Sequence, residues 1–374
     1  MLGLYVHIPF CRSRCSYCDF FLITRLDHVE RFFKALSRET ELRRKELEGR
    51  TIGSIHFGGG TPSLVPLRHI ASWLDQVSGL CSFSPDVEIA FEANPEDLDG
   101  NLMDDLLGTG VNRLSLGVQS FCDRKLLALG RKHTAAEARS VTDRAMRIFP
   151  SVSADLICGV PGEDRTVWES DLDAALDLGP HHLSVYMLSL EPKTLLCRDV
   201  SRGLLKVPGE DIQALMYEVA LETMEQQGYL HYEVSNFCLP GHHSRYNLAS
   251  WKREEYLGFG PSAHSFLKTG GRETRFANVS SLSGYLHDPG NTLSFRENLT
   301  GEERYTEQVF LSLRINSGLD VEFLRKDNKL GQSLPETIDR FVRKGWVRED
   351  SGRLYLTGKG FLFADLIAGE FIFG

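Results

Sequence analysis

Three cysteines lie within eight positions near the start of the chain, Cys11, Cys15 and Cys18 in HIPFCRSRCSYCDF (7–20). Thiolates at such spacing bind zinc, hold an iron–sulfur cluster or form a redox pair. Structural zinc takes four ligands, and the nearest further candidate, His7, precedes the cluster on a predicted strand. A redox pair needs only one Cys-x-x-Cys unit. A [4Fe–4S] cluster held by three thiolates would leave one iron open for another ligand, so the triple favours this interpretation.

Other polar residues follow predicted strands further along the chain. They are residues 58–61 in HFGGGTP, Glu92 in FEANP, Gln119 in GVQSF and Asp155 in SADLICGVPGE. In βα barrels, functional groups collect at the carboxyl ends of the strands, so we expect these residues to share one site. The glycines allow the backbone to approach a ligand closely, and Arg131 in GRKH can bind a carboxylate. Each could equally be a solvated loop residue or a helix cap, and their joint placement is the stronger argument.

The elements that must position these residues alternate along the first 200 residues. Short apolar runs predict six strands, at 4–8, 54–58, 87–93, 113–118, 152–157 and 182–188. Helical periodicity occurs between them, at 29–47, 67–77, 97–110, 134–149 and 166–179. Repeated βα units predict a parallel sheet in an α/β fold. Six units are two short of a closed barrel, so we expect a partial (β/α)6 barrel over residues 1–200.

The alternation ends near residue 200. A helix is expected over 209–228, within a connecting segment (201–300) that is dense in Gly, Asn, His and aromatic residues. The remaining residues, 301–374, predict a smaller α+β domain with a winged-helix-like end, from helices at 305–315 and 333–346 and a two-stranded wing at 347–357.

Composition excludes several classes of function. The net charge is −9, and residues 301–374 carry 11 Lys and Arg against 12 Asp and Glu, so DNA binding by the winged end is not expected. No apolar run approaches the roughly 20 residues that span a bilayer. The first residues do not read as a signal peptide, and the five scattered cysteines suit a reducing compartment, so we expect a cytoplasmic protein.

The cysteine segment resembles a known superfamily. The spacing Cys-x3-Cys-x2-Cys, with the aromatic Tyr17 before the last cysteine, is similar to that of radical S-adenosylmethionine (SAM) proteins. The resemblance implies a [4Fe–4S] cluster on Cys11, Cys15 and Cys18, with SAM on the open iron. It also implies a reductant that supplies the cluster with an electron, which releases a 5′-deoxyadenosyl radical from SAM.

Further motifs narrow the resemblance to one branch. YVHIPFCRSRCSYCDF, HFGGGTPS, FEANP, GVQSF, GRKH and DLICGVPGE follow one another, and YLGFGPSAHSF and LTGKGFLFAD continue the likeness. Together they resemble the oxygen-independent coproporphyrinogen III oxidase branch. The residues that this resemblance places against SAM are Tyr5, Tyr17, Gly59, Gly60, Thr61, Glu92, Gln119, Arg131, Asp155 and Met187.

This branch contains two kinds of protein. The oxidase decarboxylates two propionates of coproporphyrinogen III, whereas its heme chaperone relatives bind heme and transfer it to acceptor proteins. The oxidase carries a further cysteine two residues after the third, and a long extension before the cluster. Here Phe20 fills that position and ten residues precede Cys11. Both features favour the heme chaperone members.

One motif departs from the chaperone pattern. The heme motif of these chaperones is similar to His-Asn-x-x-Tyr-Trp, and the corresponding residues here are Tyr-Asn-Leu-Ala-Ser-Trp (246–251). Heme iron is held by histidine or by tyrosine in different proteins. Tyr246 is therefore a candidate axial ligand, as are the nearby His242 and His243, which could also be ordinary loop residues.

Three other functions remain as alternatives. They are the oxidase reaction itself, a radical reaction on another tetrapyrrole, and an iron–sulfur regulator that uses the winged end. The leading hypothesis is a heme chaperone whose partners are heme or another porphyrin, an acceptor protein and a reductant, with neither nucleic acid nor a membrane span.

Overall fold

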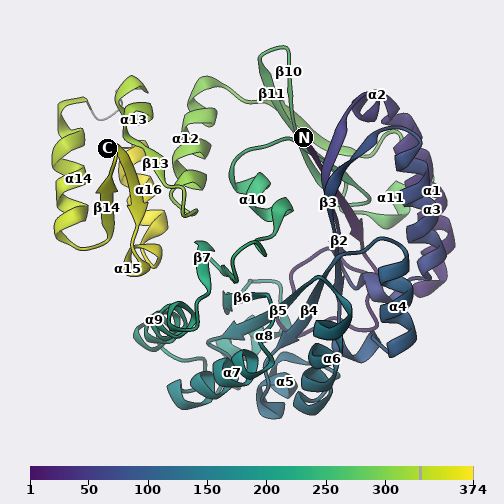
Figure 1. Ribbon diagram of the computed structural model, residues 1–374, viewed down its shortest axis with the longest axis horizontal. Coiled ribbons are helices and arrows are strands. Elements are labelled where there is room, and N and C mark those ends of the chain that lie inside the picture. The colour runs from purple at the N-terminus through teal and green to yellow at the C-terminus, as the bar shows by residue number, and fades with distance from the viewer. Residues whose placement is uncertain (328–330, 374) are drawn as a thin grey trace.

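The computed structural model describes residues 1–327 and 331–373. Six consecutive parallel strands form the centre of one large sheet, in the order in which they follow along the chain (Figure 1). They are β1 (Leu2–Ile8), β2 (Thr51–Gly59), β3 (Ser82–Ala93), β4 (Arg113–Gln119), β5 (Ser151–Cys158) and β6 (His182–Met187). All six predicted strands are confirmed, and so is the α/β class with its partial barrel.

Helices connect each strand to the next. Most of them match the predicted helices: α1 (Val29–Leu42), α2 (Arg44–Leu47), α3 (Leu67–Ser78), α4 (Gly100–Gly108), α6 (Ala135–Ile148), α7 (Arg165–Leu178) and α9 (Glu210–Gln226). The predicted helix 29–47 is interrupted at Arg43, which leaves α2 as a single turn. Two seven-residue helices of the barrel region were not predicted, α5 (Asp123–Leu129) and α8 (Leu195–Ser201), because so few residues show little periodicity. Short 3-10 turns occur at η1 (Leu26–His28), η2 (Pro62–Leu64) and η3 (Pro95–Asp97).

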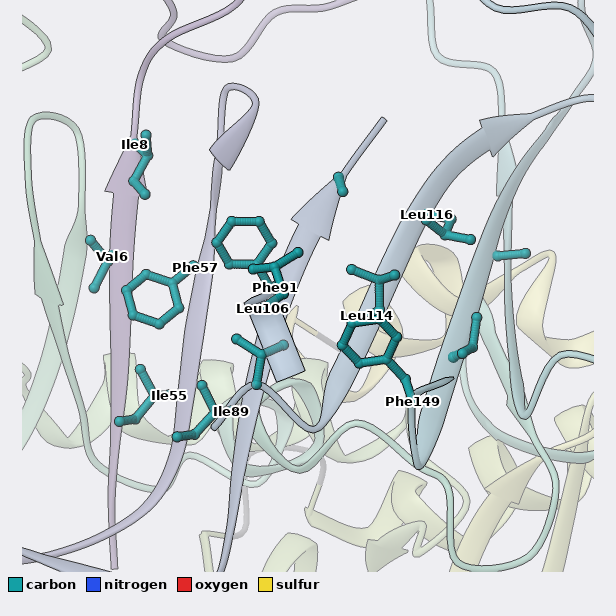
Figure 2. Close-up of a cluster of buried hydrophobic side chains, with 14 of the residues drawn as sticks. Val6, Ile8, Ile55, Phe57, Ile89, Phe91, Leu106, Leu114, Leu116 and Phe149 are labelled. Atoms are coloured by element: carbon teal, nitrogen blue, oxygen red, sulfur yellow. The ribbon is translucent and has the colours of Figure 1, made fainter. Parts of the chain in front are cut away.

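The hydrophobic core lies between the sheet and the helices. On β1, Leu2, Leu4, Val6 and Ile8 alternate with smaller or polar residues and are fully buried. Figure 2 shows Val6 and Ile8 beside the aromatic rings of neighbouring strands. Burial of each such side chain stabilises the fold by about 1.5 to 3 kcal/mol. The other face of the strands, which is mostly polar, is therefore left to line the interior of the barrel.

The segment after residue 200 extends the sheet at both edges. Strand β8 pairs antiparallel with β6, and β9 pairs parallel with β1. The added strands and helices are β7 (Leu230–Glu233), β8 (Asn236–Cys238), α10 (Arg245–Trp251), β9 (Tyr256–Phe259), β10 (His264–Thr269), β11 (Arg272–Asn278), α11 (Leu282–His287) and β12 (Leu293–Asn298). The sheet consequently has twelve strands in the described part of the chain.

The C-terminal residues form a smaller α+β unit, the yellow end of the chain in Figure 1. This unit has a hydrophobic cluster of its own. Its wing is the antiparallel pair β14 and β15, which confirms the winged-helix-like end. Its elements are α12 (Gly301–Ser312), β13 (Leu319–Asp320), α13 (Val321–Asp327), η4 (Gly331–Ser333), α14 (Leu334–Arg343), β14 (Val347–Asp350), β15 (Arg353–Leu356), α15 (Gly358–Phe361) and α16 (Ala364–Phe373). The domain boundaries at 200 and 300 stay predictions. Among the residues that the structure describes, every helix is too short or too polar to span a lipid bilayer.

Candidate functional site

A cavity of about 650 Å³ lies at the carboxyl ends of the parallel strands. All three clustered cysteines line it, as expected for residues carried on the loop after β1. Every sequence-predicted contact except Tyr5 lines the same cavity: Tyr17, Gly59, Gly60, Thr61, Glu92, Gln119, Arg131, Asp155 and Met187. The six strands thus bring residues from 11 to 187 into one site.

The loop that carries the cysteines is fixed by its neighbours. The amide of Cys11 donates to the carbonyl of Ile23 at 2.9 Å. The amide of Ser16 donates to the carbonyl of Leu129 at 3.2 Å, at the end of α5. Arg14 donates to the carbonyl of Cys18 at 3.1 Å. The loop is therefore held at both ends and in the middle by protein contacts alone.

The thiols differ in their surroundings. Cys11 is buried, and its sulfur accepts a hydrogen bond from Thr61 Oγ1 at 3.3 Å. Burial raises the pKa of Cys11 to about 11 and also raises the pKa of Cys18. Burial therefore favours the neutral thiol of Cys11 and of Cys18 until a metal displaces the proton.

Two glycines after β2 leave no room for a side chain. A Cβ on Gly60 would lie 2.7 Å from the carbonyl oxygen of Phe10 and 2.8 Å from that of Ile8. Gly59 has φ +107°, and a Cβ there would meet the ring of His7 at 2.6 Å. The GGGTP turn is thus packed directly against the strand and loop that precede Cys11.

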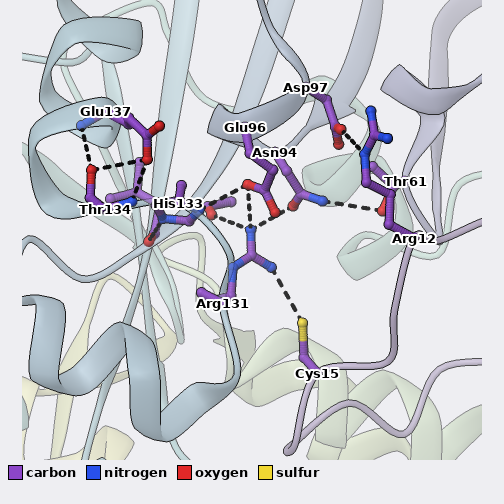
Figure 3. Close-up of polar contacts among 12 residues, drawn as sticks. Arg12, Cys15, Thr61, Asn94, Glu96, Asp97, Arg131, His133, Thr134 and Glu137 are labelled. Carbon is purple, nitrogen blue, oxygen red and sulfur yellow. Dashed lines mark hydrogen bonds and ion pairs between the residues drawn. The ribbon is translucent and has the colours of Figure 1, made fainter.

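Arg131 joins the cysteine loop to the strand ends (Figure 3). Its Nη1 lies 3.6 Å from the sulfur of Cys15, and its Nη2 donates to Asn94 Oδ1 at 2.6 Å and to the carbonyl of Gly117 at 2.8 Å. Its Nε atom is buried and has no hydrogen-bond partner among the described residues. A positive group thus lies beside a thiol at the wall of the cavity, and its buried Nε is left without a partner.

The residues that hold Arg131 were not singled out from the sequence. Asn94 also donates to Thr61 Oγ1 at 3.2 Å, and Glu96 pairs with His133 at 2.9 Å. Asn94 belongs to FEANP and His133 to GRKH, motifs named above for Glu92 and Arg131, and Glu96 follows directly after FEANP. Asn94, Glu96 and His133 could have been identified from the sequence because each is a polar residue within a few positions of a predicted contact residue.

The floor of the cavity is acidic. The Oε1 atom of Glu92 lies 2.8 Å from His56 Nε2, within hydrogen-bond distance, and Asp155 accepts from the hydroxyl of Ser115 at 3.3 Å. Burial, and next the neighbouring Glu92, raise the pKa of Asp155 to about 6. Gln119 has φ +66°, an uncommon conformation for a residue other than glycine, which turns the chain sharply at the end of β4. These side chains can bind ribose hydroxyls and an ammonium group.

Tyr5 lies inside the barrel and does not line the cavity. Its ring stacks on those of His56 and Tyr246, each with centroids 5.9 Å apart. Its hydroxyl is 3.2 Å from Nδ1 of His7, whose Nε2 donates to the carbonyl of Phe21 at 2.8 Å. Tyr5 therefore supports the cysteine loop from below.

The three predicted heme ligands lie at the opposite, amino-terminal end of the strands. The backbone amide of Tyr246 faces the buried Glu88, and its ring packs on Gly3 at the start of β1. The carbonyl of His242 accepts from Arg113 at 2.9 Å. The ring of His243 lies near the buried Tyr232. None of the three lines the cavity of the cysteines, so their assignment stays a prediction.

Phe20 occupies the position at which the oxidase members have a further cysteine. Its side chain is 66% exposed and lies at the rim of the cavity. An aromatic side chain this exposed contributes little to stability and is available to a planar apolar ligand.

The donor set fits an iron–sulfur cluster and SAM. Three thiols share the wall of one cavity with a free arginine donor and with carboxylates. Within residues 1–327 and 331–373, no group of three or more His, Cys, Asp or Glu is arranged to hold a single metal ion. Cys11, Cys15 and Cys18 would be the cluster ligands, and the cavity leaves space beside them for an amino acid and a nucleoside.

Comparison with protein families agrees with this geometry. The family description "Radical SAM superfamily" matches residues 5–175, which span β1 to α7. "HemN C-terminal domain" matches residues 299–363, which include α12 and the wing.

Individual proteins are similar to the chain over nearly its whole length. The heme chaperone HemW of Bacillus subtilis is 34% identical, over 100% of this chain and 99% of its own. The heme chaperone HemW of Mycobacterium tuberculosis is 36% identical, over 98% and 93%. Among solved structures, the coproporphyrinogen III oxidase HemN of Escherichia coli superposes with a TM-score of 0.83 at 25% identity, over 99% of this chain and 89% of that one.

Proposed function

Because the chain belongs to the HemW heme chaperone family of the radical SAM superfamily, we propose that it binds heme and transfers it to an acceptor protein. The observation that carries the proposal is the shared cavity, which the three cysteines and the strand-end residues line together. These residues lie almost entirely within the part of the chain that matches the superfamily. Phe20 occupies the position at which the oxidase members have a fourth cysteine. Heme is the cargo in this proposal, and the cluster and SAM are the resident cofactors.

Different residues of the cavity would hold the cluster and SAM. Cys11, Cys15 and Cys18 bind three irons of a [4Fe–4S] cluster. Arg131 pairs with the carboxylate of SAM and keeps a positive charge beside the Cys15 thiolate. A reduced cluster supplies one-electron chemistry toward the sulfonium of SAM when both are bound.

The remaining contacts position SAM. The backbone groups of Gly59 and Gly60 approach its amino group, and Thr61, Tyr17 and Met187 line the wall around it. Glu92, Gln119 and Asp155 bind the ribose hydroxyls and the ammonium group. Tyr5 acts indirectly, because its stack with His56 supports the floor on which Glu92 lies.

A second candidate function is favoured by the solved structure. The likeness to coproporphyrinogen III oxidase extends over 99% of this chain, so an oxidative decarboxylation of that substrate is the alternative. Phe20, in place of the cysteine that the oxidase members carry, supports the chaperone instead.

The proposal is tested by an anaerobic heme titration of the cluster-reconstituted chain, followed at the Soret band. Saturable binding of one heme per chain is expected, with transfer of that heme to apomyoglobin as a generic acceptor. Cys11→Ala, Cys15→Ala and Cys18→Ala should each lose the cluster, which is measured as iron and sulfide per chain, whereas Cys81→Ala and Cys197→Ala should retain it.

Two results would contradict the proposal. Absence of saturable heme binding would remove the chaperone function. Vinyl products formed from coproporphyrinogen III by the reduced, SAM-loaded chain would establish the oxidase reaction.

A further inference from the structure

Helix α10 carries residues 246–251, the segment that corresponds to the heme motif of the chaperones. It lies between α12 of the C-terminal unit and the first strands of the barrel (Figure 1). Hydrogen bonds close its last turn: the amides of Lys252, Arg253 and Glu254 donate to carbonyls of residues 248–250 at 2.9 to 3.0 Å. A helix of seven residues is not stable by itself in water, so contacts with the rest of the chain must hold α10 in place.

The side chain of Arg253 connects the end of α10 to the C-terminal unit. Arg253 is 7% exposed, and its Nη2 pairs with Glu273 on β11 at 2.5 Å. Its Nε pairs with Glu307 on α12 at 3.2 Å. Glu307 also pairs with Arg275 on β11. These four residues, the Arg253 cluster, bring two cations and two carboxylates together from three segments of the chain, which is what a buried guanidinium requires.

The backbone of Arg253 depends on the same contacts. Its φ is +55°, in the left-handed region that residues other than glycine adopt infrequently. Such a conformation persists where the surrounding structure determines it. Here the two ion pairs fix the guanidinium, which also lies over the ring of Phe266 at 5.4 Å from the centroid. The turn that ends α10 is therefore held by a side chain that contacts α12.

The last residue of α10 has a second connection to the C-terminal unit. The indole of Trp251 hydrogen-bonds to the carboxyl of Glu233, which is 1% exposed. Glu233 forms a β-bridge with Ile315, just after α12. On both sides of this bridge, the backbone of 232–234 is hydrogen-bonded to that of 314–316 at 3.0 Å. Both connections from the end of α10 therefore lead to α12 or to the residues that follow it.

We propose that Arg253 is a positioning residue for the heme motif, and that it makes the heme affinity of the motif depend on the contact between α10 and α12. Arg253 does not line the cavity of the cysteines, so it acts through α10. While α12 is in contact, Glu307 fixes Arg253 and Arg253 fixes the turn that ends the helix. When α12 separates, the guanidinium loses one carboxylate and the motif loses its support. This inference rests on the proposed function, and it names how the site that holds the cargo is regulated.

Two substitutions remove the connection in different ways. Glu307→Gln removes the charge on α12 and leaves Arg253 paired with Glu273. Arg253→Met removes both ion pairs of the guanidinium with a side chain that still fills part of its space. The matched controls are Glu322→Gln, at an exposed glutamate of α13, and Arg272→Gln, at an exposed arginine of β11.

The first measurement is hydrogen–deuterium exchange of the heme-free, full-length chain, followed in a peptide that covers residues 248–254. Glu307→Gln should raise the exchange rate of this peptide about tenfold, because the amides that close α10 open more often when Arg253 is less firmly held. A peptide that covers α6, on the far side of the barrel sheet, should exchange as in the wild type. Both control variants should match the wild type in both peptides.

The second measurement is a heme titration of the cluster-reconstituted chain, followed at the Soret band. Arg253→Met should weaken heme binding about tenfold, and Glu307→Gln about threefold, since it leaves one ion pair in place. The affinity for SAM, measured by isothermal titration, should stay that of the wild type because Arg253 does not line the cavity of the cysteines. A purely structural role would lower the free energy of unfolding and leave the heme affinity of the folded chain unchanged.

Other results overturn the inference. If both variants bind heme as the wild type does, with or without a loss of stability, the inference is wrong and the proposed function still stands. Unchanged exchange of residues 248–254 in Glu307→Gln overturns it as well. If the wild type binds no heme, the proposed function fails and the inference fails with it. Circular dichroism checks the folding of Arg253→Met, and Glu307→Gln, a conservative change, decides the matter if that variant does not fold.

Discussion

The guanidinium of Arg131 lies 3.6 Å from the sulfur of Cys15 and is held there by Asn94 and the carbonyl of Gly117. The same group thus faces a cluster cysteine and the space for SAM. Arg131→Gln should weaken SAM binding by about tenfold or more, because a charge-assisted bond is lost in a buried site. Isothermal titration of the cluster-reconstituted variant measures this affinity. Arg124→Gln, an exposed change on α5, should have no effect, and equal affinities in both variants would contradict the role of Arg131.

Replacement of Gly60 by a larger residue is predicted to disturb the cysteine loop. A Cβ at this position would lie 2.7 to 2.8 Å from backbone carbonyls, which cannot move without displacing β1 or the loop before Cys11. We expect Gly60→Ala to lower the free energy of unfolding by about 2 kcal/mol or more, by overpacking, and to lower iron incorporation. Urea denaturation and iron analysis measure the two effects.

A matched glycine provides the control. Gly108 ends α4, nothing beyond its own helix lies within 4 Å of the point that a Cβ would occupy, and its φ is not positive. Gly108→Ala should leave stability unchanged or raise it by up to about 1 kcal/mol. A similar loss of stability in both variants would mean that the loss in Gly60→Ala does not come from the short distance between the added Cβ and the backbone carbonyls.

Replacement of the buried Lys125 is predicted to cause a large loss of stability. It is 1% exposed, and its Nζ pairs with Glu163 and with Asp171 at 2.7 Å while donating to the carbonyl of Ile157 at 3.1 Å. Lys125→Met would leave two buried carboxylates without their cation. The free energy of unfolding should fall by about 3 to 5 kcal/mol, as measured by urea denaturation at pH 7.

The exposed pair of Arg165 and Glu169, also on the helical side of the sheet, gives the comparison. Arg165→Met should cost at most about 0.5 kcal/mol, because water screens the pair. A loss below about 1 kcal/mol for Lys125→Met would indicate that Glu163 and Asp171 take up protons when the lysine is removed.

The buried carboxyl of Glu233 is predicted to make the stability of the fold depend on pH. Burial raises the pKa of this carboxyl to about 7, against hydrogen bonds from Asn236, the Ser235 amide and Trp251 that lower it. The folded state therefore holds the proton longer than the unfolded state does, so stability falls as the pH rises from about 4.5 to 7 and then stays constant. Glu233→Gln, which stays neutral, should be more stable than wild type at pH 8 by about 2 to 3 kcal/mol.

The difference should vanish near pH 4, where Glu233 is largely protonated in both states. Thermal or urea unfolding at both pH values measures it. A constant difference across this range would show that the carboxyl does not titrate between the two states.

Much of the barrel and of the cavity was predictable from local patterns. Short apolar runs identified the six strands, and parallel strands necessarily bring their carboxyl ends together, so Glu92 and Asp155 were expected in one site. The C-terminal wing was predicted from the local sequence at 347–357, after two predicted helices. These features depend on periodicity within a few residues.

Other features depend on contacts between distant segments, and local patterns do not encode them. The hydrogen bond between Glu92 and His56, or that between Arg131 and Asn94, requires the register of neighbouring strands. The strands of 230–298 are short, and their pairing with β1 and β6 has no local signature. The packing of α11 on α1 likewise joins segments that lie far apart in the sequence.

The parallel pairing of β1 with β9 has a consequence for synthesis of the protein. Residues 3–6 pair with residues 256–259, so β1 has an open edge until more than two thirds of the chain has left the ribosome. Pairing over so long a sequence separation is slow and is completed late in folding. The second edge of the strand that leads into the cysteine loop is therefore covered only after β9 has been synthesised, and we expect the metal centre to be completed in a barrel whose first strand is already paired on both sides.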